Sequence, residues 1–176
     1  MPGSGKTTVG RLLARQLGRR FFDSDKEVER QIGETIRTFF EREGESAFRE
    51  IEEAVLSGLV RGGAAVIATG GGAILREATR RSLHANSTVV YLRTRPEELF
   101  RRLRHDTRRP LLQVDDPLAR LQELFAFRDP LYVETAHFVI ETRRPSVAGL
   151  VNTVMMQLEA VGIVDHMRSF STLEGS

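Results

Sequence analysis

The first residues of the chain combine glycines, a lysine and threonines at the spacing of a phosphate-binding loop. Gly5, Lys6 and Thr7 match the last three positions of the pattern Gly, four residues, Gly, Lys, Ser or Thr. Gly3 and Gly5 have no β-carbon, so backbone N–H groups can approach phosphate oxygens closely. Lys6 offers a charge for the outer phosphates, and the Thr7 hydroxyl is an oxygen ligand that Mg²⁺ accepts. A flexible Gly/Ser-rich terminus is the alternative, which the helical pattern that follows disfavours.

Two carboxylates follow the first short apolar segment. Asp23 and Asp25 flank Ser24 directly after two phenylalanines. One carboxylate at such a strand end could help to hold Mg²⁺ through water, and the other could accept the proton of a hydroxyl that receives a phosphoryl group. The alternative is that Asp23 or Ser24 only caps a helix.

Three consecutive glycines follow a second apolar segment. Gly70, Gly71 and Gly72 come directly after residues 64–69, which predict a buried strand. A bare backbone at this position leaves amide donors free for a small, oxygen-rich substrate. The alternative is a loose turn between a strand and a helix.

Arginines are the third group of candidate functional residues. Arg49, Arg109 and Arg128 are each typical of a protein surface, but a phosphoryl-transfer site needs cations for a substrate carboxylate and for transition-state charge. Arg109 lies in the segment 105–117, which could close over the site and exclude water. Arg93 and Arg95 follow a further apolar strand, at the end where ligands bind in such folds.

The hydrophobic periodicity predicts strands that alternate with helices. The predicted strands are 21–23, 64–69, 88–92 and 137–141, and the predicted helices are 9–17, 24–32, 35–44, 48–62, 75–83, 96–104, 118–127 and 146–162. This order predicts an α/β fold, a three-layer α/β/α arrangement with a parallel sheet and ligands beyond the carboxyl ends of the strands. We expect one domain over 1–162, with a substrate-binding segment at about 24–60, a lid at about 105–117 and a disordered tail over 163–176.

Composition narrows the class of protein. The 176 residues carry a net charge of +2, and Lys6 and Lys26 are the only lysines among 26 basic residues, a bias that suits phosphate or carboxylate recognition more than nucleic-acid binding. The absence of cysteine excludes disulfides and thiolate metal sites, and the four histidines have no metal-ligand spacing. No apolar run is long enough to span a membrane and no signal peptide is present, so we expect a cytoplasmic protein.

The motifs together resemble shikimate kinase. The matching segments are PGSGKTTVGRLLA, FFDSDKEVE, EGESAFREIEE, ATGGGAI, VVYL, RRPLL and RDPLY, in an order that covers residues 1 to about 160. The resemblance implies a P-loop fold of the nucleoside-monophosphate-kinase type with a five-stranded parallel sheet. It also implies a monomeric enzyme that transfers the γ-phosphate of ATP to the 3-hydroxyl of shikimate, on the route to chorismate and aromatic amino acids, without nucleic-acid or membrane partners.

The resemblance further implies a role for each matching residue. Thr7 would bind Mg²⁺ and Asp23 would assist through water, while Asp25 would bind shikimate hydroxyls and act as the base. Arg109 would approach the ATP phosphates from the lid, and the segment 142–145 would lie near adenine. The residues implied to hold the ATP phosphates are Gly3, Ser4, Gly5, Lys6, Thr7 and Thr8, and those implied to hold shikimate besides Asp25 are Arg49 and Arg128, for its carboxylate, and Gly70, Gly71 and Gly72.

The sequence departs from the family pattern at its start. Family members have a strand and then Gly before the position of Met1, and without that strand both of its neighbours would have unpaired edges. Two alternatives to an active shikimate kinase therefore remain: a truncated homologue that binds nucleotide with little or no turnover, and a related kinase for another carboxylated polyol such as gluconate.

Overall fold

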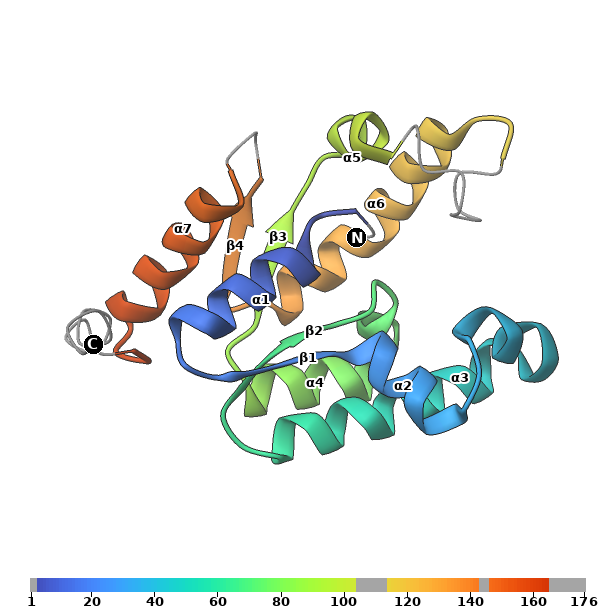
Figure 1. Ribbon diagram of the computed structural model, residues 1–176. Helices are drawn as coiled ribbons and strands as arrows, with labels where there is room; N and C mark the ends of the chain where they lie inside the picture. Colours follow the sequence, from blue (N-terminus) through green and yellow to red (C-terminus); the bar gives the residue numbers. More distant parts are fainter. Residues whose placement is uncertain (1–2, 104–113, 143–145, 165–176) are drawn as a thin grey trace, which may run out of the picture.

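The computed structural model describes residues 3–103, 114–142 and 146–164 (Figure 1). Short parallel strands alternate with helices in this part of the chain, as the hydrophobic pattern predicts. The strands are β1 (Arg20–Asp23), β2 (Ala65–Ala68), β3 (Val90–Arg93) and β4 (Phe138–Glu141). The helices are α1 (Lys6–Gln16), α2 (Ser24–Ile32), α3 (Ile36–Arg61), the 3₁₀ turn η1 (Ala73–Leu75), α4 (Glu77–Asn86), α5 (Pro96–Leu103), α6 (Pro117–Thr135) and α7 (Val147–Ala160).

Neighbouring residues of β3 face two different apolar clusters, which places helices on both faces of the strands. Leu92 packs with residues of α1, β4 and α7, such as Leu13, Ile140 and Val154. Tyr91, one position earlier, packs in the opposite cluster with residues of η1, α5 and α6. Because side chains alternate between the faces of a strand, this arrangement confirms the predicted three-layer α/β/α class.

The strands form two parallel pairs. In one pair Phe21 lies opposite Val66, and in the other Tyr91 lies opposite Val139. No pairing joins β2 to β3 among the described residues, so the implied five-stranded sheet is not found there. A cavity of about 520 Å³ lies between these two strands and is lined by 63–69 on one side and 86–92 on the other. Apolar side chains of α1 and α7, among them Val9 and Leu158, close it.

The predicted break at Gly44 is present, because its φ of 82° and ψ of 177° are not helical and put a kink into α3 between the two predicted helices. The predicted end of α6 differs from the structure. α6 continues through Pro130 to Thr135, although the prediction ends at Phe127. Contacts of Tyr132 with Gly71 and Tyr91 outweigh the local signal and hold α6 together beyond Pro130. At the C-terminal end, the backbone N–H of Ile163 donates to Leu158 O, whereas 165–176 lie outside the described residues.

The predicted helix caps at Thr35 and Ser146 are present, with side-chain oxygens that accept from Thr38 N–H and Gly149 N–H. None of the helices in the described ranges is both long enough and apolar enough to cross a bilayer.

Candidate active site

The phosphate-binding loop leads into α1 through a glycine that no other residue would replace easily. Gly5 has a φ of 88°, in the left-handed region that favours glycine, and it sits at the N-cap position without any side-chain cap. The first N–H groups of α1 therefore face the loop with no capping oxygen, as an anion-binding helix N-terminus requires. Ser4 is buried and Lys6 lies at the first turn of this helix.

The end of β1 meets this loop through a hydrogen bond between Thr7 and Asp23. Thr7 Oγ1 donates to Asp23 Oδ2 over 3.0 Å. Asp23 occupies the N-cap position of α2 but its side chain makes no capping hydrogen bond, so the alternative that it only caps a helix is wrong. Two hard oxygen ligands, a hydroxyl and a carboxylate, thus lie together beside the loop.

Ser24 joins the end of β1 to the glycine turn. Its buried Oγ accepts a hydrogen bond from the backbone N–H of Gly70 over 2.9 Å. The sequence suggested only a cap for this residue. Its observed contact, 46 positions along the chain, fixes the glycine turn against the carboxyl end of β1.

Asp25 and Glu52 both lie against Gly70. A β-carbon at Gly70 would stand 3.0 Å from Glu52 Oε1 and closer still to Asp25 Oδ1, so the carboxylates approach at van der Waals distance only because the residue is glycine. Burial raises the pKa of the Asp25 carboxyl above its ordinary value; the charge of Asp23 adds to this, and the ammonium of Lys6 opposes it. Such a partly desolvated carboxylate can act as a base or hydroxyl acceptor.

Arg49 is held between two acidic residues of its own helix. Its Nη1 contacts Glu52 Oε2 at 2.6 Å, and its Nη2 contacts Glu45 Oε1 at 3.0 Å. The side chains of Arg49 and Glu52 are only 14% and 4% exposed, whereas that of Glu45 is 60% exposed. Burial raises the pKa of Glu52, and the ion pair with Arg49 counteracts part of that effect. The guanidinium lies against Gly72, where an added β-carbon would overlap it.

Arg128 and Tyr132 reach the glycine turn from α6. Arg128 Nη1 and the Tyr132 hydroxyl both donate to the carbonyl of Gly71, over 3.2 and 2.6 Å. Arg128 Nε is buried and has no hydrogen-bond partner within the part of the chain described. A buried guanidinium nitrogen without a partner is suited to donate to an oxygen of a ligand. Burial raises the pKa of Tyr132 to about 12, so its hydroxyl remains a donor at neutral pH.

The structure thus brings together most of the predicted site residues. Asp25, Arg49 and Arg128 converge on residues 70–72, and Lys6 is close enough to lower the pKa of Asp25. Glu52 and Tyr132 are members of the cluster that the sequence did not single out. The i, i+3 spacing from Arg49 to Glu52 was the available signal for the first, since such residues are neighbours on a helix.

The other candidates are not among the described residues of this cluster. Arg109 and residues 143–145 fall outside the described residues, so the lid and the adenine contact stay predictions. Arg93 is at the predicted strand end but forms ion pairs with Asp129 and Glu141. His84 and His137 stack with ring centroids 4.3 Å apart, and the described residues hold no cluster of three metal-binding side chains.

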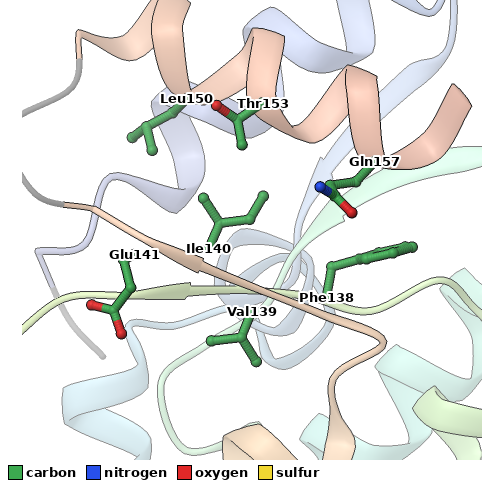
Figure 2. A pocket seen from close by; sticks show the side chains of 7 residues that line it. All are labelled: Phe138, Val139, Ile140, Glu141, Leu150, Thr153 and Gln157. Carbon is green, nitrogen blue, oxygen red and sulfur yellow. The ribbon is translucent and has the colours of Figure 1, made fainter. Parts of the chain in front are cut away.

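A second, smaller cavity of about 390 Å³ lies between β4 and α7, and it contains none of the predicted site residues. Figure 2 shows Ile140 pointing toward α7, whereas the adjacent Val139 points to the other face of the strand. The residues that line it are Phe138, Val139, Ile140, Glu141, Leu150, Thr153 and Gln157.

Comparison with known proteins agrees with this geometry. Residues 2–159 match the family model described as shikimate kinase. A protein of Burkholderia thailandensis named shikimate kinase is 58% identical over 162 residues, which make up 92% of this chain and 88% of that protein. Its counterpart in Ralstonia nicotianae is 55% identical over 162 residues, 92% of this chain and 85% of the other.

Solved structures give the same result. The shikimate kinase of Acinetobacter baumannii in complex with shikimate has a TM-score of 0.86 at 46% identity, over 92% of this chain and 90% of that chain. The shikimate kinase of Aquifex aeolicus has a TM-score of 0.80 at 32% identity, over 92% and 94%. The chain is therefore a member of the shikimate kinase family, with the P-loop fold that its sequence motifs imply.

Proposed function

We propose that this ATP-dependent kinase phosphorylates the 3-hydroxyl of shikimate, giving shikimate 3-phosphate for chorismate and aromatic amino acid biosynthesis. The observation that carries the assignment is the convergence of Asp25, Arg49 and Arg128 on the glycine turn beside the phosphate-binding loop. A solved relative in complex with shikimate supports this acceptor over gluconate.

The acceptor site contains groups of the right chemistry for a cyclic polyol acid. Arg128 and Arg49 would bind the carboxylate, since a guanidinium offers a fork of donors that fits two oxygens. Asp25 would accept hydrogen bonds from ring hydroxyls and take the proton of the hydroxyl that attacks the phosphorus. The backbone N–H groups of Gly71 and Gly72 would contact the acceptor, whereas that of Gly70 already donates to Ser24 Oγ.

The phosphate-binding loop would hold ATP. The N–H groups of 3–8 and the start of α1 would surround the β- and γ-phosphates, and Lys6 would neutralise charge that builds up on the transferred group. Arg109 would add a second cation from the lid.

The residues beside the loop fit Mg²⁺. Thr7 Oγ1 and Asp23 Oδ2 are hard oxygen donors 3.0 Å apart, and Mg²⁺ commonly takes one or two protein oxygens together with substrate phosphates and water. Thr7 would bind the ion, and Asp23 would hold one of its waters. Bound Mg²⁺ would supply charge neutralisation for the phosphates of ATP.

A coupled assay for ADP release tests the proposal. Shikimate with ATP and Mg²⁺ should give turnover, whereas gluconate at the same concentration should give none. Arg128→Ala should mainly raise the KM for shikimate, by about 30-fold, because an ion pair to the carboxylate is lost. ATP binding by calorimetry without ADP release would instead favour a homologue that binds nucleotide and does not turn over.

A further inference from the structure

Asp129 is a buried carboxylate that accepts three hydrogen bonds and that the proposed reaction does not use. It follows Arg128 directly in α6 and is 8% exposed. Its Oδ1 accepts hydrogen bonds from the Tyr91 hydroxyl and from Arg93 Nε, both over 2.9 Å, and its Oδ2 accepts from Arg93 Nη2 over 2.6 Å. We call Tyr91, Arg93 and Asp129 the β3–α6 clamp.

The clamp acts at a weak point of α6. Pro130 has no N–H to donate, and its ring clashes with the carbonyl four residues earlier, so a helix is locally weakened at this position. The clamp fixes the residue immediately before the proline to β3. Two residues after the proline, the ring of Tyr132 stacks on Tyr91 with centroids 4.7 Å apart and an interplanar angle of 20°. Tyr91 therefore contacts α6 on both sides of Pro130.

Residues on either side of the same proline reach the glycine turn. Arg128 and Tyr132 are four positions apart, so they share a helix face, and both donate to Gly71 O. The direction in which Arg128 points thus depends on how this turn of α6 is held.

We propose that Asp129 is a positioning residue for the phosphoryl acceptor: the β3–α6 clamp sets the place of the Arg128 guanidinium that binds the acceptor carboxylate. The inference rests on the proposed role of Arg128. The clamp also accounts for Arg93, which lies at the end of β3 where substrates bind in such folds but is not available to bind a phosphate or a carboxylate. Asp129 and Glu141 neutralise its charge, and its guanidinium lies 5.7 Å from the ring centre of Phe125.

Steady-state kinetics of Asp129→Asn, Arg93→Gln and Tyr91→Phe test the proposal. Asp129→Asn keeps the size of the side chain but turns an NH₂ group toward Arg93. It should raise the KM for shikimate about tenfold, with kcat and the KM for ATP within about threefold. Tyr91→Phe keeps the ring stack and should raise the KM for shikimate about threefold. Arg93 and Asp129 act through their shared ion pair. The double variant Arg93→Gln with Asp129→Asn should therefore raise the KM for shikimate no more than Asp129→Asn alone.

Glu141→Gln is the matched control, because it removes the other ion pair of Arg93 and leaves Asp129 in place. It should leave both KM values within about twofold. A KM for shikimate that stays within twofold in Asp129→Asn, while Arg128→Ala raises it, overturns the proposal. So does a rise in KM that is equal for shikimate and ATP, because a change confined to the acceptor carboxylate would not weaken ATP binding.

Two further results complete the test. Should Asp129→Asn fail to fold, Tyr91→Phe decides alone, since it removes one hydroxyl and keeps the ion pair. Should Arg128→Ala leave the KM for shikimate unchanged, the proposed role of Arg128 fails and the clamp's role in acceptor binding fails with it.

Discussion

The Thr7 hydroxyl and the Asp23 carboxylate, 16 positions apart, form a 3.0 Å hydrogen bond at the point where the phosphate-binding loop meets the end of β1. This bond holds next to each other two oxygen atoms of the kind that Mg²⁺ prefers. It also replaces the helix cap that Asp23 could have provided for α2.

Asp23→Asn should raise the Mg²⁺ concentration needed for half-maximal activity by about 10- to 100-fold, as is typical when a group that orients a metal's ligands is lost. The amide still offers an oxygen to Thr7, so the fold should survive. A Mg²⁺ titration of the initial rate is the measurement. Glu27→Gln, which removes a carboxylate of the same helix that pairs with Arg30, is the control and should leave the titration unchanged. Identical curves for Asp23→Asn and the parent would exclude Asp23 from metal binding.

Asp25→Asn should lower kcat by about 10²- to 10⁴-fold, because a general base would be lost, and it should stabilise the protein at neutral pH. Burial raises the pKa of Asp25 in the folded state above its ordinary value of 3.8. The folded state therefore binds the proton more tightly, and the resulting stability is complete below pH 3.8 and lost as pH rises through the folded-state pKa. The amide of Asp25→Asn does not ionise, so the variant does not lose this stability as pH rises.

The free energies of unfolding of Asp25→Asn and the parent, measured in denaturant at a series of pH values, should diverge as pH rises above 3.8. They should then run parallel once the folded-state pKa is passed. Burial raises the pKa of Glu52, and the charge of Asp25 adds to this, so the substitution also reduces the stability that Glu52 loses as pH rises and widens the divergence in the same direction. Curves that stay parallel from pH 3 to pH 8 would contradict the shift.

Gly72→Ala should weaken acceptor binding more than it destabilises the fold. A β-carbon there would overlap the guanidinium of Arg49, which is the mobile end of a side chain and can move away. The displaced Arg49 would lose its place against the glycine turn, so the KM for shikimate should rise about tenfold, while the free energy of unfolding falls by about 1 kcal/mol. Gly58→Ala is the control, since Gly58 lies in the exposed part of α3 with nothing within 4 Å of an added β-carbon. It should stabilise the protein by about 0.5–1 kcal/mol and leave kinetics unchanged. An unaltered KM in Gly72→Ala would argue against a role for Arg49 in binding.

The elements of this fold were predictable because each has a local signal. Apolar runs locate the strands, and Thr35 and Ser146 mark helix starts through hydroxyls that accept from the first turn. The three glycines and the acidic pair after β1 could be singled out from residue type alone, and the structure places the two segments side by side. Their roles in binding and catalysis stay predictions.

What the sequence did not reveal depends on contacts between distant residues. The extension of α6 through Pro130 runs against the local signal, and it is held by partners on β3 and at Gly71 that lie far away in sequence. The burial of Glu52 cannot be inferred from composition, because a charged residue of an amphipathic helix is usually exposed. The pairing of Arg93 cannot be inferred from the sequence either. Arg93 follows a strand, as a ligand-binding residue would, and only the tertiary structure brings Asp129 beside it.

The two strand pairs leave an opening that the packing of the molecule does not fill. β2 and β3 run in the same direction as their partners, and each lines the cavity of about 520 Å³. Apart from Lys6 at the start of α1, the side chains that line it from α1 and α7 are apolar. Backbone groups on two facing strand edges can both be satisfied by one extended segment between them. Such a segment would have both faces covered by helices, so its residues should be apolar throughout.

An extension of about six Val, Ile or Leu residues followed by Gly, fused ahead of Met1, should therefore stabilise the protein. Each fully buried apolar side chain contributes about 1.5–3 kcal/mol before the cost of ordering the chain, and a net gain of about 3 kcal/mol would raise the Tm by about 6–12 °C for a protein of this size. Scanning calorimetry gives the Tm, and kcat for shikimate should rise with it, because the loop from Gly3 to Thr8 would gain a fixed anchor. An extension of equal length made of Gly and Ser is the control and should change neither quantity. If the apolar extension gave the same Tm as the Gly/Ser extension, the opening between β2 and β3 would not be a site for a strand.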